Sequence, residues 1–246
     1  MIKWQHQLKR AKEIIEMNVE SHIIDLGQRL YEELQNHLRS LIDDKAVIEK
    51  LFTTAGIDSD TQDLLIAILE EHGVKDLLNI GRTPVIPVLQ KLSEFIANKR
   101  GLDLHAAKMG VCAWAIALNV GSVNDVGSLF NSPEQAKAAV ELGRKMNEAI
   151  MMKWQKMISS PQKMAWTLAQ RFSDDQEKLV LLAVHIRYLI ERGGCPIPIL
   201  LLKREMRRLQ RSVGFSAASA ALGVGAWGLA LGSLKKSDLP DFIASS

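Results

Sequence analysis

The sequence predicts an all-α protein made of two diverged copies of one helical module. Three observations lead to this prediction: a tryptophan-centred pattern occurs twice, several segments open with helix-start signals, and apolar residues near the N-terminus are spaced three and four apart. Alternating runs rich in Val, Ile and Thr, which would indicate strands, are absent. We therefore expect ten to twelve helices and no sheet.

The repeat is clearest around two tryptophans. Residues 110–118 read Gly-Val-Cys-Ala-Trp-Ala-Ile-Ala-Leu, and residues 223–231 read Gly-Val-Gly-Ala-Trp-Gly-Leu-Ala-Leu, about 113 positions later. A buried tryptophan anchors a hydrophobic core, so we expect the shared residues to maintain the fold; a paired ligand site lined by both tryptophans is the alternative. The matched structural residues are Gly110, Trp114, Gly223 and Trp227.

Three further blocks recur in the same order, with spacings that drift only between about 111 and 116 positions. The matching ranges are 26–32 with 142–148, 59–63 with 173–177, and the glycine–proline segments 81–87 with 194–198. A period this long indicates a duplicated domain and not a solenoid. We expect a first module at 1–128 and a second at 129–246, for which packing about a pseudo-two-fold axis is one open arrangement.

Local signals place several helix starts. Ser59 with Gln62 and Ser173 with Gln176 have the spacing of a capping box, in which the serine accepts a backbone N–H and the glutamine reaches back. Two Ser-Pro pairs put proline at a first helical position. The expected starts lie near Asp60, Pro133, Pro161 and Asp174.

At the N-terminus, the apolar residues fall on one face of a helix. These are Ile14, Ile15, Val19, Ile23, Leu26 and Leu30. The chain is expected to continue from a long N-terminal helix pair into short helices and the Trp114 helix. From Pro133 onward the same order is repeated.

An uncharged segment over 213–234 offers a membrane alternative. It is long enough to span a bilayer and contains Gly228-x-x-x-Gly232, a dimerisation pattern of membrane helices. The matching stretch of the first copy, however, carries Asp103, His105 and Lys108. We therefore favour a buried core helix, and keep membrane docking and an oligomer interface as alternatives.

A basic stripe occurs only in the second copy. At 100° per residue its five cations share one helix face, opposite Leu202, Met206 and Leu209. Such a stripe suits an acidic protein, an anionic membrane or nucleic-acid phosphates, and it is also compatible with a solvated surface. The candidate partner-binding residues are Lys203, Arg204, Arg207, Arg208 and Arg211.

Composition and motifs give no positive case for an enzyme. The formal net charge is +3, and the two cysteines, Cys112 and Cys195, favour a reducing, intracellular setting. No signal-peptide core precedes the first helix. The histidines lack metal-binding spacing, and the phosphate-loop and nucleophile-elbow motifs are missing. The sequence thus predicts no catalytic residue, cofactor or metal.

The segment 101–118 resembles a small helical accessory module found in many bacterial multidomain proteins, with the pattern Val-x-x-Trp-Ala-x-Ala-Leu-Gly. Val111, Trp114 and Leu118 fit, and Asn119 replaces the final glycine. In the second copy Gly228 departs from the pattern. The resemblance implies a bacterial source and an accessory or interaction role, and carries over no catalytic residue.

These observations lead to one expected function and two alternatives. We expect a cytoplasmic interaction protein, an adaptor, regulator or assembly subunit, with a protein partner and with homo-oligomerisation left open. The first alternative is membrane docking through the basic stripe 203–211 and the apolar segment 213–234. The second is nucleic-acid binding through the same stripe.

Overall fold

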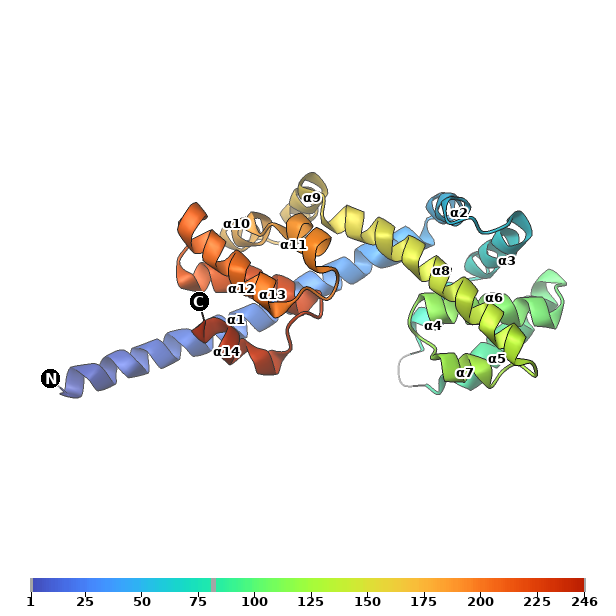
Figure 1. Ribbon diagram of the computed structural model, residues 1–246, viewed down its shortest axis with the longest axis horizontal. Coiled ribbons are helices and arrows are strands. Elements are labelled where there is room, and N and C mark those ends of the chain that lie inside the picture. Colours follow the sequence, from blue (N-terminus) through green and yellow to red (C-terminus); the bar gives the residue numbers. More distant parts are fainter. Residues whose placement is uncertain (1, 81–82, 246) are drawn as a thin grey trace. The chain divides into compact units, whose positions relative to one another are not determined.

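The computed structural model describes residues 2–80 and 83–245, with side chains from residue 19 onward (Figure 1). Over these residues the chain forms fourteen α-helices, one π-helical and one 3-10 segment, and no strand, so the all-α prediction is confirmed and the expected number of helices was too low. Gly81 and the side chains of His6, Ile14 and Ile15 lie outside the described residues.

The chain folds into two compact units whose limits differ from the expected modules 1–128 and 129–246. Unit 1 comprises Met1–Leu38 and Gln155–Ser246, and unit 2 comprises Arg39–Trp154. The unit boundaries fall inside two long helices, α1 (Ile2–Asp43) and α8 (Pro133–Ile158). Each of these long helices therefore contributes residues to both units.

Unit 2 is built around the helix that carries Trp114. This helix packs on three of the short helices, and the indole Nε1 of Trp114 donates a hydrogen bond to the carbonyl oxygen of Leu65 at 3.0 Å. Its ring lies 5.7 Å from that of Phe52. The short helices are α2 (Lys45–Thr54), α3 (Ser59–Glu70), α4 (Gly73–Leu78), α5 (Val85–Arg100), α6 (Leu104–Ala117) and α7 (Val123–Gly127).

Unit 1 is built around the helix that carries Trp227. Its indole Nε1 donates to the carbonyl oxygen of Leu181 at 2.9 Å. The elements are α9 (Pro161–Arg171), α10 (Asp175–Ala183), α11 (Ile186–Gly193), α12 (Ile199–Arg208), the π-helical segment η1 (Leu209–Val213), α13 (Ala217–Ala230), the 3-10 segment η2 (Lys236–Asp238) and α14 (Leu239–Ala244).

The uncharged segment 213–234 contains α13, which forms the centre of unit 1. Ala220, Val224 and Trp227 are buried, and α13 packs against α10 and α12. Gly223 allows the close approach to α10, because a Cβ there would lie 2.6 Å from the carbonyl oxygen of Val180. Among the helices of the described part of the chain, none is long and apolar enough to cross a membrane.

Two helix starts are capped differently from the prediction. Asp58 and not Ser59 is the N-cap of α3, and its carboxylate accepts the backbone N–H of Thr61. Likewise Asp174 and not Ser173 caps α10, accepting from Gln176 and Glu177. A carboxylate at this position also opposes the positive helix end, which explains why the aspartates cap both helices. Gln62 instead donates its side-chain amide to the carbonyl of Ile57.

The other two starts are confirmed. Helix α8 begins at Pro133 and α9 begins at Pro161, as the Ser-Pro pairs predicted. Proline has no N–H to lose at a first helical position, and its fixed φ suits the helix.

Candidate binding groove

The basic stripe is only partly a free surface. Leu202, Met206 and Leu209 are buried as predicted. Arg204, Arg207 and Arg211 are exposed, and Lys203 is half-buried. Because Arg211 lies in the π-helical segment η1, beyond the end of α12, the five cations do not follow one regular α-helical face.

Arg208 is engaged inside unit 1 instead of facing a partner. Its guanidinium donates to both carboxylate oxygens of Glu205, at 2.7 and 2.8 Å, and to the carbonyl oxygen of Ala183 at 2.7 Å. Glu205 is only 3% exposed and also accepts the backbone N–H of His185 at 2.7 Å. This pair, which we call the Glu205–Arg208 clamp, was not predicted as such.

The clamp holds a break between α10 and α11. Helix α10 ends at Ala183, Val184 is extended, and α11 begins at Ile186. A helix break leaves backbone carbonyl and N–H groups without helical partners. Arg208 satisfies the carbonyl of Ala183 and Glu205 satisfies the N–H of His185, so side chains from α12 replace the hydrogen bonds of a continuing helix.

In unit 2 the break comes later, between the end of α3 at Glu70 and the start of α4 at Gly73. Helix α3 accepts the Trp114 hydrogen bond at Leu65 and runs on to Glu70. Helix α10 accepts the Trp227 hydrogen bond at Leu181 and stops at Ala183. The early break, two residues after the indole acceptor, therefore distinguishes unit 1 from unit 2.

A hollow of about 240 Å³ lies beside the break, among α9, α10, α11 and α13. Its wall is chiefly apolar, and Trp227 contributes to it. Two of its residues are well exposed, Leu182 at 40% and Tyr188 at 39%. The lining residues that matter here are Met164, Leu181, Leu182, Ile186, Tyr188 and Trp227.

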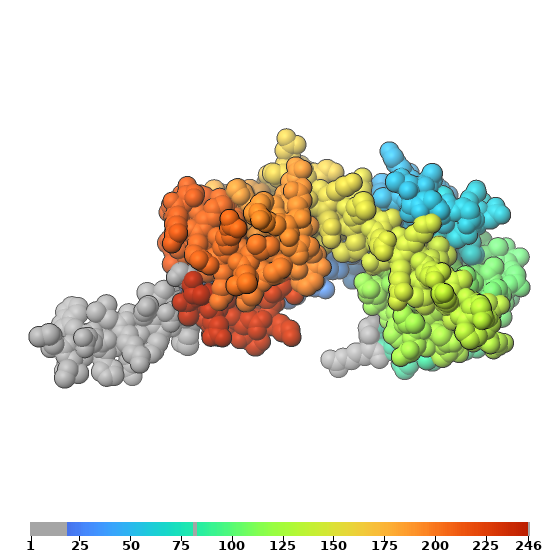
Figure 2. All heavy atoms as spheres, viewed as in Figure 1, coloured from blue at the N-terminus to red at the C-terminus, as the bar shows by residue number. Residues whose placement is uncertain are grey.

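A second hollow of about 230 Å³ shares His185 and Tyr188 with the first and lies between α11 and α12. Its wall includes Arg204 and both members of the clamp. We call the two hollows together the α11 groove, because they meet at the N-terminal end of that helix. The groove belongs entirely to unit 1, whose α11 and α12 lie within the amber-to-orange region of Figure 2.

The groove combines apolar walls with a cationic rim. Residues 186–213 contain seven Arg and Lys but only two Glu. One of these is Glu205 of the clamp, and the other, Glu191, is paired with Arg187 at 2.8 Å. Arg192 lies 5.7 Å from the ring centre of Tyr188 and donates to its hydroxyl. The rim is therefore suited to a ligand that carries negative charge.

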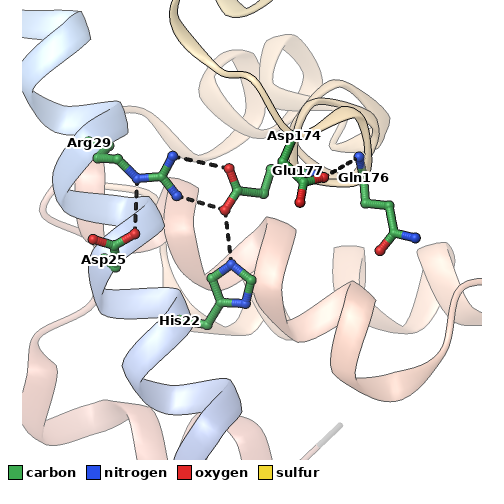
Figure 3. A network of polar contacts seen from close by, with 6 residues as sticks. All are labelled: His22, Asp25, Arg29, Asp174, Gln176 and Glu177. Carbon is green, nitrogen blue, oxygen red and sulfur yellow. Dashed lines mark hydrogen bonds and ion pairs between the residues drawn. The ribbon is translucent and has the colours of Figure 1, made fainter.

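A separate polar network joins α1 to the start of α10 (Figure 3). Glu177, 7% exposed, receives two hydrogen bonds from Arg29, at 2.7 and 3.1 Å, and lies 2.9 Å from His22 Nε2. The guanidinium of Arg29 lowers the pKa of Glu177, and the carboxylate in turn raises the pKa of Arg29. The Nε of Arg29 also donates a hydrogen bond to the carboxylate of Asp25. A carboxylate so fully paired is a structural anchor.

The two thiols are not activated. Burial raises the pKa of the Cys112 thiol to about 12 and also raises the pKa of Cys195. A nucleophilic cysteine has a lowered pKa. Within the described residues, no group of three or more His, Cys, Asp or Glu side chains is arranged to hold a metal ion.

Sequence reasoning missed the core of the groove, although one signal was present. Glu205 lies at the spacing of Leu202, Met206 and Leu209, on the face that the amphipathic pattern buries. A charged residue at such a position needs a buried partner. His185, Tyr188 and Leu182 carried no comparable signal.

Comparison with protein families, with curated proteins and with solved structures found no match to this chain.

Proposed function

We propose that this protein is a helical adaptor that binds an acidic, apolar segment of a partner protein in the α11 groove. The observation that carries the proposal is the clamp. Glu205 and Arg208 keep α10 broken beside Trp227, and the break adjoins an apolar hollow with arginines at its rim. A bulky apolar side chain fits a hollow of about 240 Å³, and acidic neighbours would face Arg187 and Arg204.

The proposal assigns different roles to the basic residues. Arg204 faces the groove and contributes attraction, whereas Arg208 preserves its shape. Arg207 and Arg211 are exposed and supply long-range steering. Lys203 is a secondary contributor. Binding and not catalysis is the proposed activity, and a cytoplasmic setting is part of the proposal.

The test is selection of a displayed random peptide library on the full chain. We expect enrichment of peptides with a Leu, Phe or Trp flanked by Asp or Glu. The affinity of one selected peptide is then measured by fluorescence anisotropy. Leu182→Glu and Arg204→Glu should each weaken binding by about tenfold or more. The matched control is Leu104→Glu, because Leu104 is exposed to a similar extent, 45%, but lies in unit 2.

Two results would contradict the proposal. The first is a selection without an acidic, apolar pattern, or peptides that bind both groove variants as tightly as wild type. The second comes from testing the two alternative partners, an anionic membrane and a nucleic acid, with phosphatidylserine vesicles and a mixed-sequence DNA duplex. If either binds more tightly than every selected peptide and Arg204→Glu abolishes that binding, the partner is not a peptide.

We also propose that the chain is a tandem duplication. Three geometric matches support this. Trp114 and Trp227 donate to Leu65 and Leu181. Helices α6 and α13 both have fourteen residues. Asp58 and Asp174 cap the helices that receive the indoles. The aspartates place the two copies 116 positions apart here, so the alignment of Ser59 with Ser173 is shifted by two residues.

A further inference from the structure

Each compact unit combines a long helix from one copy with short helices from the other. Helix α1 precedes α2–α7 in the chain, yet its residues up to Leu38 belong to unit 1 with α9–α14. Helix α8 precedes α9–α14, yet its residues up to Trp154 belong to unit 2 with α2–α7. Given the duplication proposed above, we infer that the two copies have exchanged their long helices, so that the chain is a fused, helix-swapped dimer.

The same glycine contact occurs in both units. A Cβ on Gly27 of α1 would lie 3.0 Å from Leu229 Cβ and 3.3 Å from the carbonyl oxygen of Ala226, both on α13. A Cβ on Gly143 of α8 would lie 2.6 Å from Ile116 Cβ and from the carbonyl oxygen of Ala113, both on α6. Each glycine thus lets a long helix approach the tryptophan helix of the other copy.

Two residues after each glycine there is a cationic side chain. It contacts the N-terminal end of the helix whose backbone carbonyl accepts the indole hydrogen bond. Arg29 pairs with Glu177 in the first turn of α10. Lys145 donates to the carbonyl oxygen of Gly56, in the loop before α3, at 2.8 Å. In each unit, the tryptophan helix and the N-terminal end of the neighbouring helix, α3 or α10, therefore form a docking surface. The long helix of the other copy in the same chain packs on this surface.

The continuity of the long helices agrees with the exchange. Helix α1 runs unbroken from Gly27 to Asp43, and only Asp44 separates it from α2. Only Ser159 and Ser160 separate α8 from α9. Gly27 lies sixteen residues, roughly 24 Å, before the end of α1, and its contact with Leu229 buries this part of the helix on the other copy and not on the adjoining α2.

The experiment cuts the folded full chain between the copies. A site for a sequence-specific protease is inserted after Asn131, an exposed residue between α7 and α8, and the purified protein is cleaved. We expect the two fragments to co-elute from a size-exclusion column under native conditions with the mass of the intact chain, because each unit contains parts of both.

A charge reversal then tests which contacts join the fragments. In the cleaved protein, Arg29→Glu should weaken fragment association by about tenfold or more, and adding Glu177→Arg should largely restore it. Lys137→Glu, at an exposed position of α8, is the matched control and should change little. Circular dichroism of the uncleaved variants checks that each one folds.

Two outcomes would overturn the inference. One is the separation of the cleaved chain into two fragments that are each helical, because modules that keep their own long helices need not stay together. The other is equal fragment association for Arg29→Glu, the double variant and wild type, which would show that α1 does not dock on the second copy.

Discussion

At the scale of single residues, the buried charges gather in one unit. Among the described residues the buried carboxylates are Glu33, Glu177 and Glu205, and all three belong to unit 1. Each has a cationic partner: Arg171 lies 3.3 Å from Glu33, and Arg29 and Arg208 pair with the other two. A buried carboxylate without such a partner would be costly, so each pair fixes the position of the helices that carry it.

The Arg29–Glu177 pair predicts a specific acid sensitivity. Because Arg29 lowers the pKa of Glu177 in the folded state, the pair stabilises the fold fully above the ordinary glutamate pKa of about 4.3. This stabilisation is lost as pH falls through the lowered folded pKa. Arg29→Gln should therefore cost about 2 kcal/mol of unfolding free energy at pH 7 and progressively less as the pH falls below the ordinary glutamate pKa.

Urea unfolding at pH 7 and pH 3 measures this difference. Lys137→Gln serves as the control, because the Lys137–Glu141 pair is strongly exposed and exposed pairs contribute little. A gap between Arg29→Gln and wild type that is equally large at pH 3 and pH 7 would show that the ion pair is not the source of the stability.

At the scale of elements, the two units differ in the break between α10 and α11, which comes early in unit 1. The side chains that hold this break, Glu205 and Arg208, belong to a third helix, α12. In α5 the buried face carries Leu89, Leu92, Ser93 and Ile96, with no buried charge. A clamp is therefore absent from the matching face of unit 2, where α3 continues to Glu70.

Replacing the clamp with apolar residues should separate its two roles. Glu205→Leu alone should cost about 2 kcal/mol, because Arg208 and the N–H of His185 lose their partner. Glu205→Leu with Arg208→Leu should recover most of that stability, since apolar residues often replace a buried ion pair without loss. The double variant should nevertheless lose peptide binding, because nothing then holds the break open.

Urea unfolding gives the stabilities, and NMR chemical shifts of residues 183–187 report whether α10 extends. Retention of both the break and the binding in a stable double variant would mean that the clamp does not shape the groove.

Local signals in the sequence predicted the elements better than their assembly. Proline at 133 and 161 set two helix starts correctly, because the preference acts within one turn. Arg208 was assigned to an exposed stripe because only the fold brings the carbonyl of Ala183 to it. The unit boundaries were missed for the same reason: the contact of Gly27 with Leu229 spans most of the chain and leaves no local signal.

At the scale of the whole molecule, the two units differ in chain continuity. Unit 2 is one continuous segment, 39–154, whereas unit 1 is assembled from 1–38 and 155–246. Unit 1 must therefore bring together two segments separated by all of unit 2. While unit 2 is folded, its ends are fixed. When it unfolds, unit 1 has to close a flexible loop of roughly 100 residues, at an entropic cost of about 4–5 kcal/mol.

This difference predicts coupling between the units, and the coupling is reciprocal because both units share one coupling free energy. Leu65→Ala in unit 2 and Leu181→Ala in unit 1 are a matched pair, since both leucines are almost fully buried and both carbonyls accept an indole N–H. Each substitution should destabilise its own unit by about 2–4 kcal/mol. Leu65→Ala should also lower the stability of unit 1, because it populates the state in which the loop is open.

Leu181→Ala should likewise lower the stability of unit 2, because an unfolded unit 2 is restricted as a closed loop only while unit 1 is folded. Hydrogen exchange followed by mass spectrometry measures both units at once, through peptides from α3 and α10. No effect in either direction would mean that unit 1 assembles without depending on the state of unit 2.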